Sequence, residues 1–102
     1  MKKFEYIKWF WEFIDTETPV LLFYEVDLTN ERYATRMIEI FSDRTIHVIV
    51  EEGFAFVTET PVPTVEEINL EDEFYAEIIS QNAFNKIYHS ETYTGEIAFP
   101  EK

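Results

Sequence analysis

Two stretches decide the fold of this chain: FEYIKWFWEF, residues 4–13, and VLLFYEVD, residues 20–27. Aromatic and β-branched residues fill both, and such side chains fit the pleated surface of a sheet. Between them, residues 15–19 (DTETP) form a polar break that ends in proline, which is typical of a turn. We therefore expect the chain to begin with two neighbouring antiparallel strands.

Further strands are predicted downstream of this pair. Residues 32–42 (RYATRMIEIFS) and 45–51 (TIHVIVE) indicate a third and a fourth strand. Residues 54–58 continue or bend the fourth strand after Gly53, where a bulge or turn is expected. Because consecutive strands are joined by short connections, we expect an antiparallel meander.

The last third of the chain contains helix signals. Thr64 with Glu67 three residues later is the capping-box pattern, so we expect a short helix over 65–70. Ser80 is the next expected N-cap, and apolar residues at helical spacing then predict a helix over about 81–89. Residues 74–79 fit a helix or a strand, because the run is too short for its period to decide.

These elements predict a single α+β domain over residues 1–102, with residues 90–102 as a tail or an extra edge strand. We expect a curved antiparallel sheet of four to five strands with two short C-terminal helices packed on one face. Both faces of the first two strands are apolar. The second face therefore needs cover from the tail, from curling of the sheet or from a second molecule.

Composition excludes several classes of protein. The chain has 102 residues, 46% of them hydrophobic and 18% aromatic, so it can bury a core and is not an acidic disordered segment. It has no cysteine, which removes disulfides and thiol chemistry and fits a reducing compartment. No apolar run approaches the roughly 20 residues that span a bilayer. We expect a cytoplasmic protein with no membrane partner.

Net charge is the strongest functional signal. The chain carries 21 acidic and 8 basic residues, a formal net charge of −13. Such an excess repels itself, and attraction of a positively charged partner would justify it. The densest run is a predicted partner-binding surface, with a solvated face as the alternative. Its members are Glu66, Glu67, Glu71, Asp72, Glu73 and Glu77.

Catalytic and cofactor motifs are not found. His47 and His89 lack the spacing of a metal site, and two separated glycines cannot build a phosphate-binding loop. No pair among 21 carboxylates stands out as an acid and base. We expect no enzyme activity, no cofactor and no metal. Direct nucleic-acid binding is not expected either, because a stripe of lysine and arginine is missing.

A polar cluster is predicted around the third strand. Arg32, Arg36 and Glu39 belong to this strand, and the alternation places the two arginines on one face. One interpretation is an exposed cross-strand ion pair of little energetic value. The other is a partly buried arginine that organises a polar pocket, with Glu25 or Asp27 as its partner.

Several stretches also resemble a bacterial family of small proteins described as a domain of unknown function. They are YIKWFW (6–11), PVLLFYEVD (19–27), RYATRMIEIF (32–41), ETPVPTVEEINLEDEFYAEIIS (59–80) and FNKIY (84–88). The most specific piece runs from Arg36 to Phe41. Where the family usually has Asp-Gly after this motif, the chain has Asp43-Arg44. The resemblance implies a small α+β fold, and members are similar in size and charge to immunity proteins of bacterial toxin systems.

The leading hypothesis is an immunity-type inhibitor. It would bind a basic protein, a toxin and in particular a nuclease, and cover its active site. One alternative is a nucleic-acid mimic that inhibits a host defence or DNA-binding protein. Another is a homodimeric structural or ligand-binding domain that self-associates through its second apolar sheet face.

Overall fold

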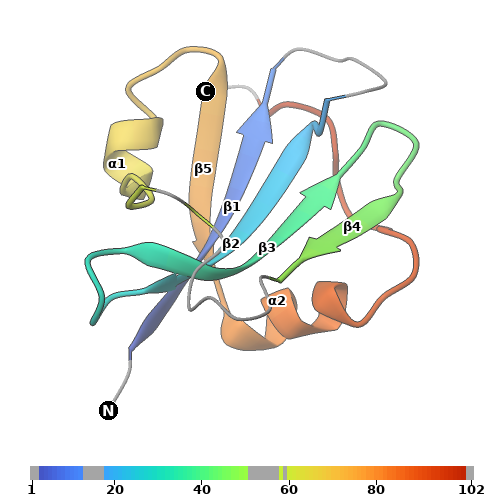
Figure 1. Ribbon diagram of the computed structural model, residues 1–102. Helices are drawn as coiled ribbons and strands as arrows, with labels where there is room; N and C mark the ends of the chain where they lie inside the picture. The colour runs from blue at the N-terminus through green and yellow to red at the C-terminus, as the bar shows by residue number, and fades with distance from the viewer. Residues whose placement is uncertain (1–2, 13–17, 51–57, 59, 101–102) are drawn as a thin grey trace.

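A five-stranded antiparallel sheet with two short helices makes up the part of the chain that the computed structural model describes, residues 3–12, 18–50, 58 and 60–100 (Figure 1). The predicted α+β class is confirmed. The elements in chain order are β1 (Phe4–Trp11), β2 (Leu21–Asp27), β3 (Tyr33–Ile40), β4 (Ile46–Ile49), α1 (Val65–Ile68), β5 (Phe74–Ile79) and α2 (Gln81–Tyr88).

The strands lie in the order β4-β3-β2-β1-β5. The first four form the predicted meander, and β5 is added beside β1 at the opposite edge. Residues 74–79, which fitted either type of element, are therefore a strand. Their pairing with β1 runs from Trp11–Phe74 to Tyr6–Ile79. A long-range partner settles what the short local pattern could not.

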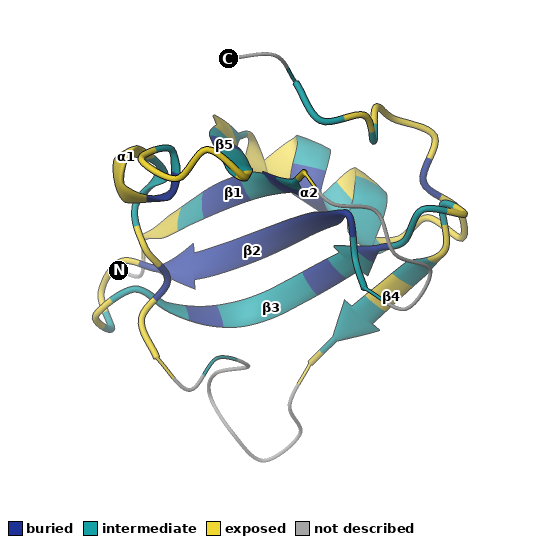
Figure 2. Cartoon of the chain, turned by 90° about the horizontal axis from the view of Figure 1, so that it is seen from above, coloured by how far each residue is buried: buried dark blue, intermediate teal, exposed yellow. Residues whose placement is uncertain are grey.

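Strand β2 is the centre of the molecule, and all seven of its residues are buried (Figure 2). Its side chains alternate between two apolar clusters. Leu21 and Phe23 belong to one cluster, whereas Leu22 and Tyr24 belong to the other. The sheet is therefore apolar on both faces, as expected, and each face requires a cover.

The two helices cover opposite faces of the sheet. Helix α2 buries Phe84 in the cluster of Phe23, and Tyr93 of the tail joins it there. Helix α1 buries Ile68 in the cluster of Leu22. The prediction that both helices pack on one face is therefore wrong. Two helices on opposite faces remove more apolar surface from water than two helices on the same face, because neither face is then left bare.

Local signals place the helices well. Thr64 Oγ1 accepts from the Glu67 backbone N–H at 3.2 Å, and the Glu67 carboxylate accepts from the Thr64 N–H at 3.1 Å, which confirms the capping box. Ser80 Oγ accepts from the Ala83 N–H at 3.1 Å and caps α2 as predicted. Helix α1 ends at Ile68 rather than at residue 70, with Asn69 as its C-cap.

The tail after α2 completes the cover of the α2 face of the sheet. The tail makes one bridge between Thr92 and Thr45 and then packs Ile97 and Phe99 on the α2 face, so among the described residues of 91–99 it is an ordered tail rather than a strand. Gly53 and residues 54–57 of the predicted continuation lie outside the described residues. Within the described ranges, no helix is long and apolar enough to cross a membrane.

Candidate functional site

A β-bulge in β3 directs the side chains of Thr35 and Arg36 toward β2. The pairing changes from Glu25–Arg36 to Val26–Ala34, so Thr35 is one extra residue in β3. Such a bulge re-aims neighbouring side chains. Thr35 Oγ1 donates to Glu25 Oε1 at 2.6 Å, and Arg36 reaches the same carboxylate. The sequence pattern gave no sign of this bulge, because Thr and Arg are ordinary strand residues at these positions.

Glu25 and Arg36 form a two-point ion pair. Arg36 Nε donates to Glu25 Oε1 at 2.9 Å, and Arg36 Nη2 donates to Oε2 at 2.6 Å. The Tyr6 hydroxyl adds a third donor to Oε2 at 2.8 Å. Glu25 is buried and the arginine is partly buried. Parallel N–H···O bonds of this kind are the strong form of an ion pair. Glu25 and Arg36 are cross-strand partners, but the pair is not the exposed one of the first interpretation. The geometry fits a partly buried arginine with Glu25 as its partner.

Helix α2 closes over this pair. Arg36 Nη2 also donates to Asn85 Oδ1 at 3.0 Å. The guanidinium carbon lies 4.9 Å from the centre of the Phe84 ring and 4.5 Å from that of Tyr88. Guanidinium groups bind aromatic faces at such distances. Arg36 therefore ties α2 to the sheet, through contacts with residues almost fifty positions away in the chain.

The protonation states at this junction are fixed around neutral pH. Burial acts to raise the pKa of Glu25, but hydrogen bonds from Arg36, Thr35 and Tyr6 outweigh it and hold the pKa below its usual value. Burial, reinforced by the hydrogen bond to Glu25, raises the pKa of Tyr6 to about 12. A general acid or base needs a pKa near the working pH. The junction is therefore suited to holding α2 rather than to proton transfer.

The other members of the predicted polar pocket do not join this junction. Arg32 donates from Nη2 to Glu5 at 2.9 Å and from Nε to the Val62 carbonyl at 2.9 Å. Its backbone φ of 66°, after 56° at Glu31, is left-handed, so Arg32 belongs to the turn before β3 and leaves the face of Arg36. The prediction of one pocket containing both arginines is therefore wrong.

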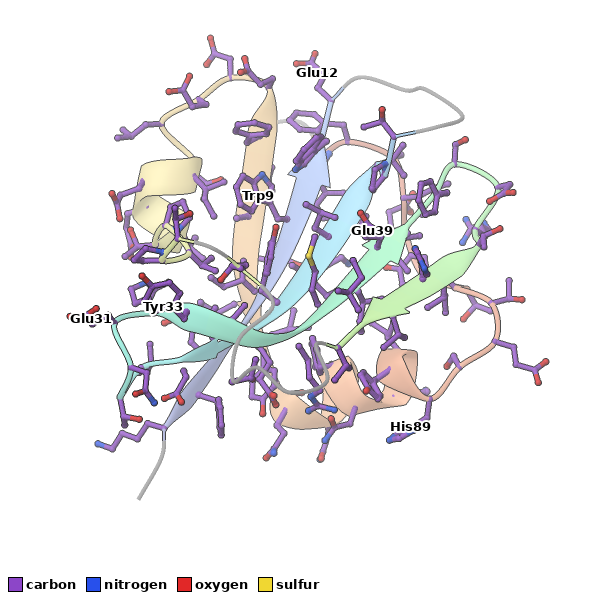
Figure 3. The ribbon with its side chains drawn as sticks, in the orientation of Figure 1. Trp9, Glu12, Glu31, Tyr33, Glu39 and His89 are labelled. Carbon is purple, nitrogen blue, oxygen red and sulfur yellow. The ribbon has the colours of Figure 1, made fainter. Side chains whose placement is uncertain are left out.

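Asp27 and Glu39 also have separate environments. The fully buried Asp27 accepts from the Thr29 backbone N–H at 2.9 Å and from the Asn30 amide at 2.7 Å, which holds the turn after β2. Glu39 lies 3.2 Å from His47 Nδ1 of β4. Glu39 pairs with Leu22 on the α1 face of the sheet, which is also the face of Trp9 (Figure 3). Asp27 therefore stabilises a turn, and Glu39 makes a cross-strand contact with β4.

The predicted acidic run is mostly one surface. Five of its members lie on α1 and on the turn that leads to β5, and all five are exposed. We call this surface the acidic corner: Glu66, Glu67, Glu71, Asp72 and Glu73. Glu77 is separate, because it points to the α2 face of the sheet, where its carboxylate lies 4.0 Å from the Lys8 ammonium. The predicted surface thus loses one of its six residues.

Backbone and side-chain bonds hold the acidic corner in place. The Asn69 amide donates to the Ala76 carbonyl at 3.0 Å and accepts from the Ala76 N–H at 2.7 Å, which ties α1 to the outer edge of β5. The Glu12 N–H donates to the Glu73 carbonyl at 3.0 Å. Glu12 is itself exposed at this end of the sheet (Figure 3). The corner is therefore a preorganised surface rather than a free loop.

An exposed apolar side chain lies within the acidic corner. Leu70 is 81% exposed and sits between Glu67 and Glu71 in the chain. The charge around Leu70 in the sequence is of one sign, because residues 45–85 contain nine acidic residues and no lysine or arginine. Leu70 was not among the predicted site residues and was expected to be the last residue of the helix over 65–70. Its exposure follows from the end of α1 at Ile68.

No group of three or more histidine, aspartate or glutamate side chains within the described ranges is placed to hold a metal ion. Fold and surface together define the class as a small acidic α+β protein built on one sheet. The chain belongs to the family described as "Domain of unknown function (DUF6881)", which matches residues 5–93. No curated protein and no solved structure matches it. The expected membership of a family of unknown function agrees with this match.

Proposed function

We propose that this protein is an immunity-type inhibitor that binds a basic bacterial toxin in the cytoplasm and covers the toxin's active site. A nuclease is the favoured toxin, because a site that binds nucleic acid is cationic. The inhibitor supplies no chemistry and acts by occlusion. The observation that carries the proposal is Leu70, 81% exposed in the middle of five exposed carboxylates.

This arrangement matches the requirements of a tight and selective protein interface. A long-range negative potential speeds the encounter with a cationic partner. An apolar side chain surrounded by polar groups contributes most of the affinity once water is excluded. The capping box of α1 and the Asn69–Ala76 bonds preorganise the surface, so little ordering is needed on binding.

The test starts with co-expression of the product of the neighbouring gene, co-purification and rescue of growth. The association rate of the purified pair is then measured at increasing salt. Steering predicts a steep fall of this rate. A variant with Glu66→Gln, Glu67→Gln, Glu71→Gln and Asp72→Asn should associate at least about tenfold more slowly at low salt. Gln at residue 67 preserves the capping box.

A matched control separates local charge from total charge. The variant Glu31→Gln, Asp43→Asn, Glu91→Gln and Glu96→Gln removes the same number of charges from exposed residues elsewhere. It should keep most of the association rate. Leu70→Ser should raise the dissociation rate and leave the association rate nearly unchanged. Equal slowing in both four-residue variants, or association that does not depend on salt, would overturn the proposal.

A further inference from the structure

Exposed apolar side chains gather along the β5 side of the molecule. Within the described ranges, five large apolar side chains are exposed, and only Val50 lies at the β4 edge. Leu70 belongs to the acidic corner, at the start of β5. The other three line one open hollow of about 660 Å³ at the end of β5: Phe4, Leu28 and Ile78.

The hollow arises from the pairing of β1 and β5. Their register ends at Tyr6–Ile79, so Phe4 and Glu5 extend past the end of β5 and form one wall. Leu28 comes from the turn after β2, where its N–H donates to the Lys3 carbonyl at 2.9 Å. Strand β5 is an edge strand. The hollow therefore lies beside a sheet edge, the kind of place that accepts an additional chain.

The apolar part of the lining can accept an apolar side chain. The Glu5 carboxylate already accepts from Arg32 at 2.9 Å, and the Tyr6 hydroxyl already donates to Glu25 at 2.8 Å. Glu77 beside Ile78 faces Lys8 at 4.0 Å. The charges of Glu5 and Glu77 are thus paired within the protein. The surface of the hollow is about half apolar, and its exposed apolar part comes from Phe4, Leu28 and Ile78.

We infer that the hollow is the second anchor of the same docking surface, and that it receives a large apolar side chain of the basic partner. The inference rests on the proposed function for the partner's charge. Strand β5 spans about 17 Å from the acidic corner to the hollow, at the usual rise per residue. A standard interface of about 800 Å² per partner covers both. A second copy fits less well, because two chains of net charge −13 repel each other.

The probe is a synthetic peptide with a lysine block and one leucine, joined by a spacer of about five Ser and Thr residues to span β5. A matched peptide has serine in place of the leucine, and both are also made in reversed order. Backbone amide chemical shifts locate binding on the full chain, and titration measures affinity. Serine in place of the leucine should weaken binding about tenfold, the effect of leaving one such side chain unburied.

Variants of the protein localise the effect. Ile78→Ser should reproduce the tenfold loss for the leucine peptide, whereas Val50→Ser should not. The two residues are 55% and 51% exposed, so both substitutions have a similarly small effect on the core. Shifts confined to the acidic corner, with equal affinity for both peptides, would overturn the inference while the proposed function stands.

Two further outcomes keep the two proposals distinguishable. Leucine-dependent shifts at Phe4, Leu28 and Ile78 that depend neither on salt nor on the four acidic-corner substitutions would support the hollow and contradict the acidic docking surface. Sedimentation of the unliganded protein tests the second copy. A dimer that Ile78→Ser abolishes and Val50→Ser leaves intact would overturn the inference in favour of self-association.

Discussion

Glu25 and Arg36 carry opposite charges beneath α2. The N–H groups of Arg36 and the carboxylate oxygens of Glu25 provide each other with hydrogen-bond partners that water would otherwise have to supply. Removing one member leaves the other charged and partly buried. We expect Arg36→Met to lower the free energy of unfolding by about 2–3 kcal/mol, because the Glu25 carboxylate loses its strongest donors. Urea denaturation measures the change. Lys86→Met, at an exposed position of α2, is the control and should change stability little.

A double-mutant cycle tests whether the two residues act as a unit. Glu25→Gln together with Arg36→Met should cost less than the sum of the single losses by at least about 1 kcal/mol, since the double variant leaves no unpaired charge. Additive losses would show that packing of the side chains, rather than their pairing, holds α2 to the sheet.

Two buried tyrosines predict a loss of stability at high pH. Burial raises the pKa of Tyr6 to about 12, and burial together with the charge of Glu39 raises that of Tyr24 to about 12. The unfolded chain loses these protons near pH 10, whereas the folded chain retains them. Their contribution is therefore intact below pH 10 and lost as the pH rises from 10 to 12.

Denaturation across this pH range measures the effect. The variant with Tyr6→Phe and Tyr24→Phe should show a shallower decline of the free energy of unfolding than the parent. An equally steep decline in both proteins would assign the alkaline transition to other groups, such as the lysines.

At the level of elements, Asn69 replaces a missing neighbour of β5. Its side chain bonds both backbone groups of Ala76, as an adjacent strand would. We expect Asn69→Ala to lower the free energy of unfolding by about 1–2 kcal/mol and to cause association that increases with concentration, because the edge becomes available for pairing. Light scattering and denaturation test both effects. Asn82→Ala, at an exposed position of α2, should do neither.

Elements controlled by neighbouring residues were predictable from the sequence. The caps at Thr64 and Ser80 and the strand character of residues 20–27 depend on local patterns and were confirmed. The pairing of β5 with β1 and the bulge at Thr35 depend on partners far away in the chain. No local pattern encodes such contacts. For the same reason the sequence suggested Arg36 with Glu25 but gave no hint of Asn85.

Part of the candidate site could likewise be predicted from the sequence, and part could not. Its charge was visible, because carboxylates cluster in the sequence from residue 66 to residue 77. Its geometry was not visible in the sequence. Successive residues of a strand point to opposite faces of the sheet, so a shift of one residue changes the face on which a side chain lies. Glu77 is turned away from the acidic corner for this reason. Leu70 and Ile78 were not predicted, since exposure of an apolar side chain depends on where its element ends or has an unpaired edge.

For the whole molecule, the excess of negative charge should reduce stability. With a net charge of −13 on 102 residues, carboxylates repel one another most strongly in the compact state, and salt screens this repulsion. We expect the melting temperature to rise by several degrees between about 0.01 M and 0.15 M sodium chloride, where the screening length falls from about 30 to 8 Å. A change of about 1 kcal/mol corresponds to 4–8 °C for a domain of this size.

The four acidic-corner substitutions provide the decisive comparison. At low salt they should raise the melting temperature above that of the parent, and they should reduce its dependence on salt, because they remove part of the repulsion. The same substitutions are expected to slow binding of the proposed basic partner. Opposite effects on stability and on association would mean that the corner is retained for binding at the expense of the fold. A melting temperature that falls on substitution would instead assign these carboxylates a structural role.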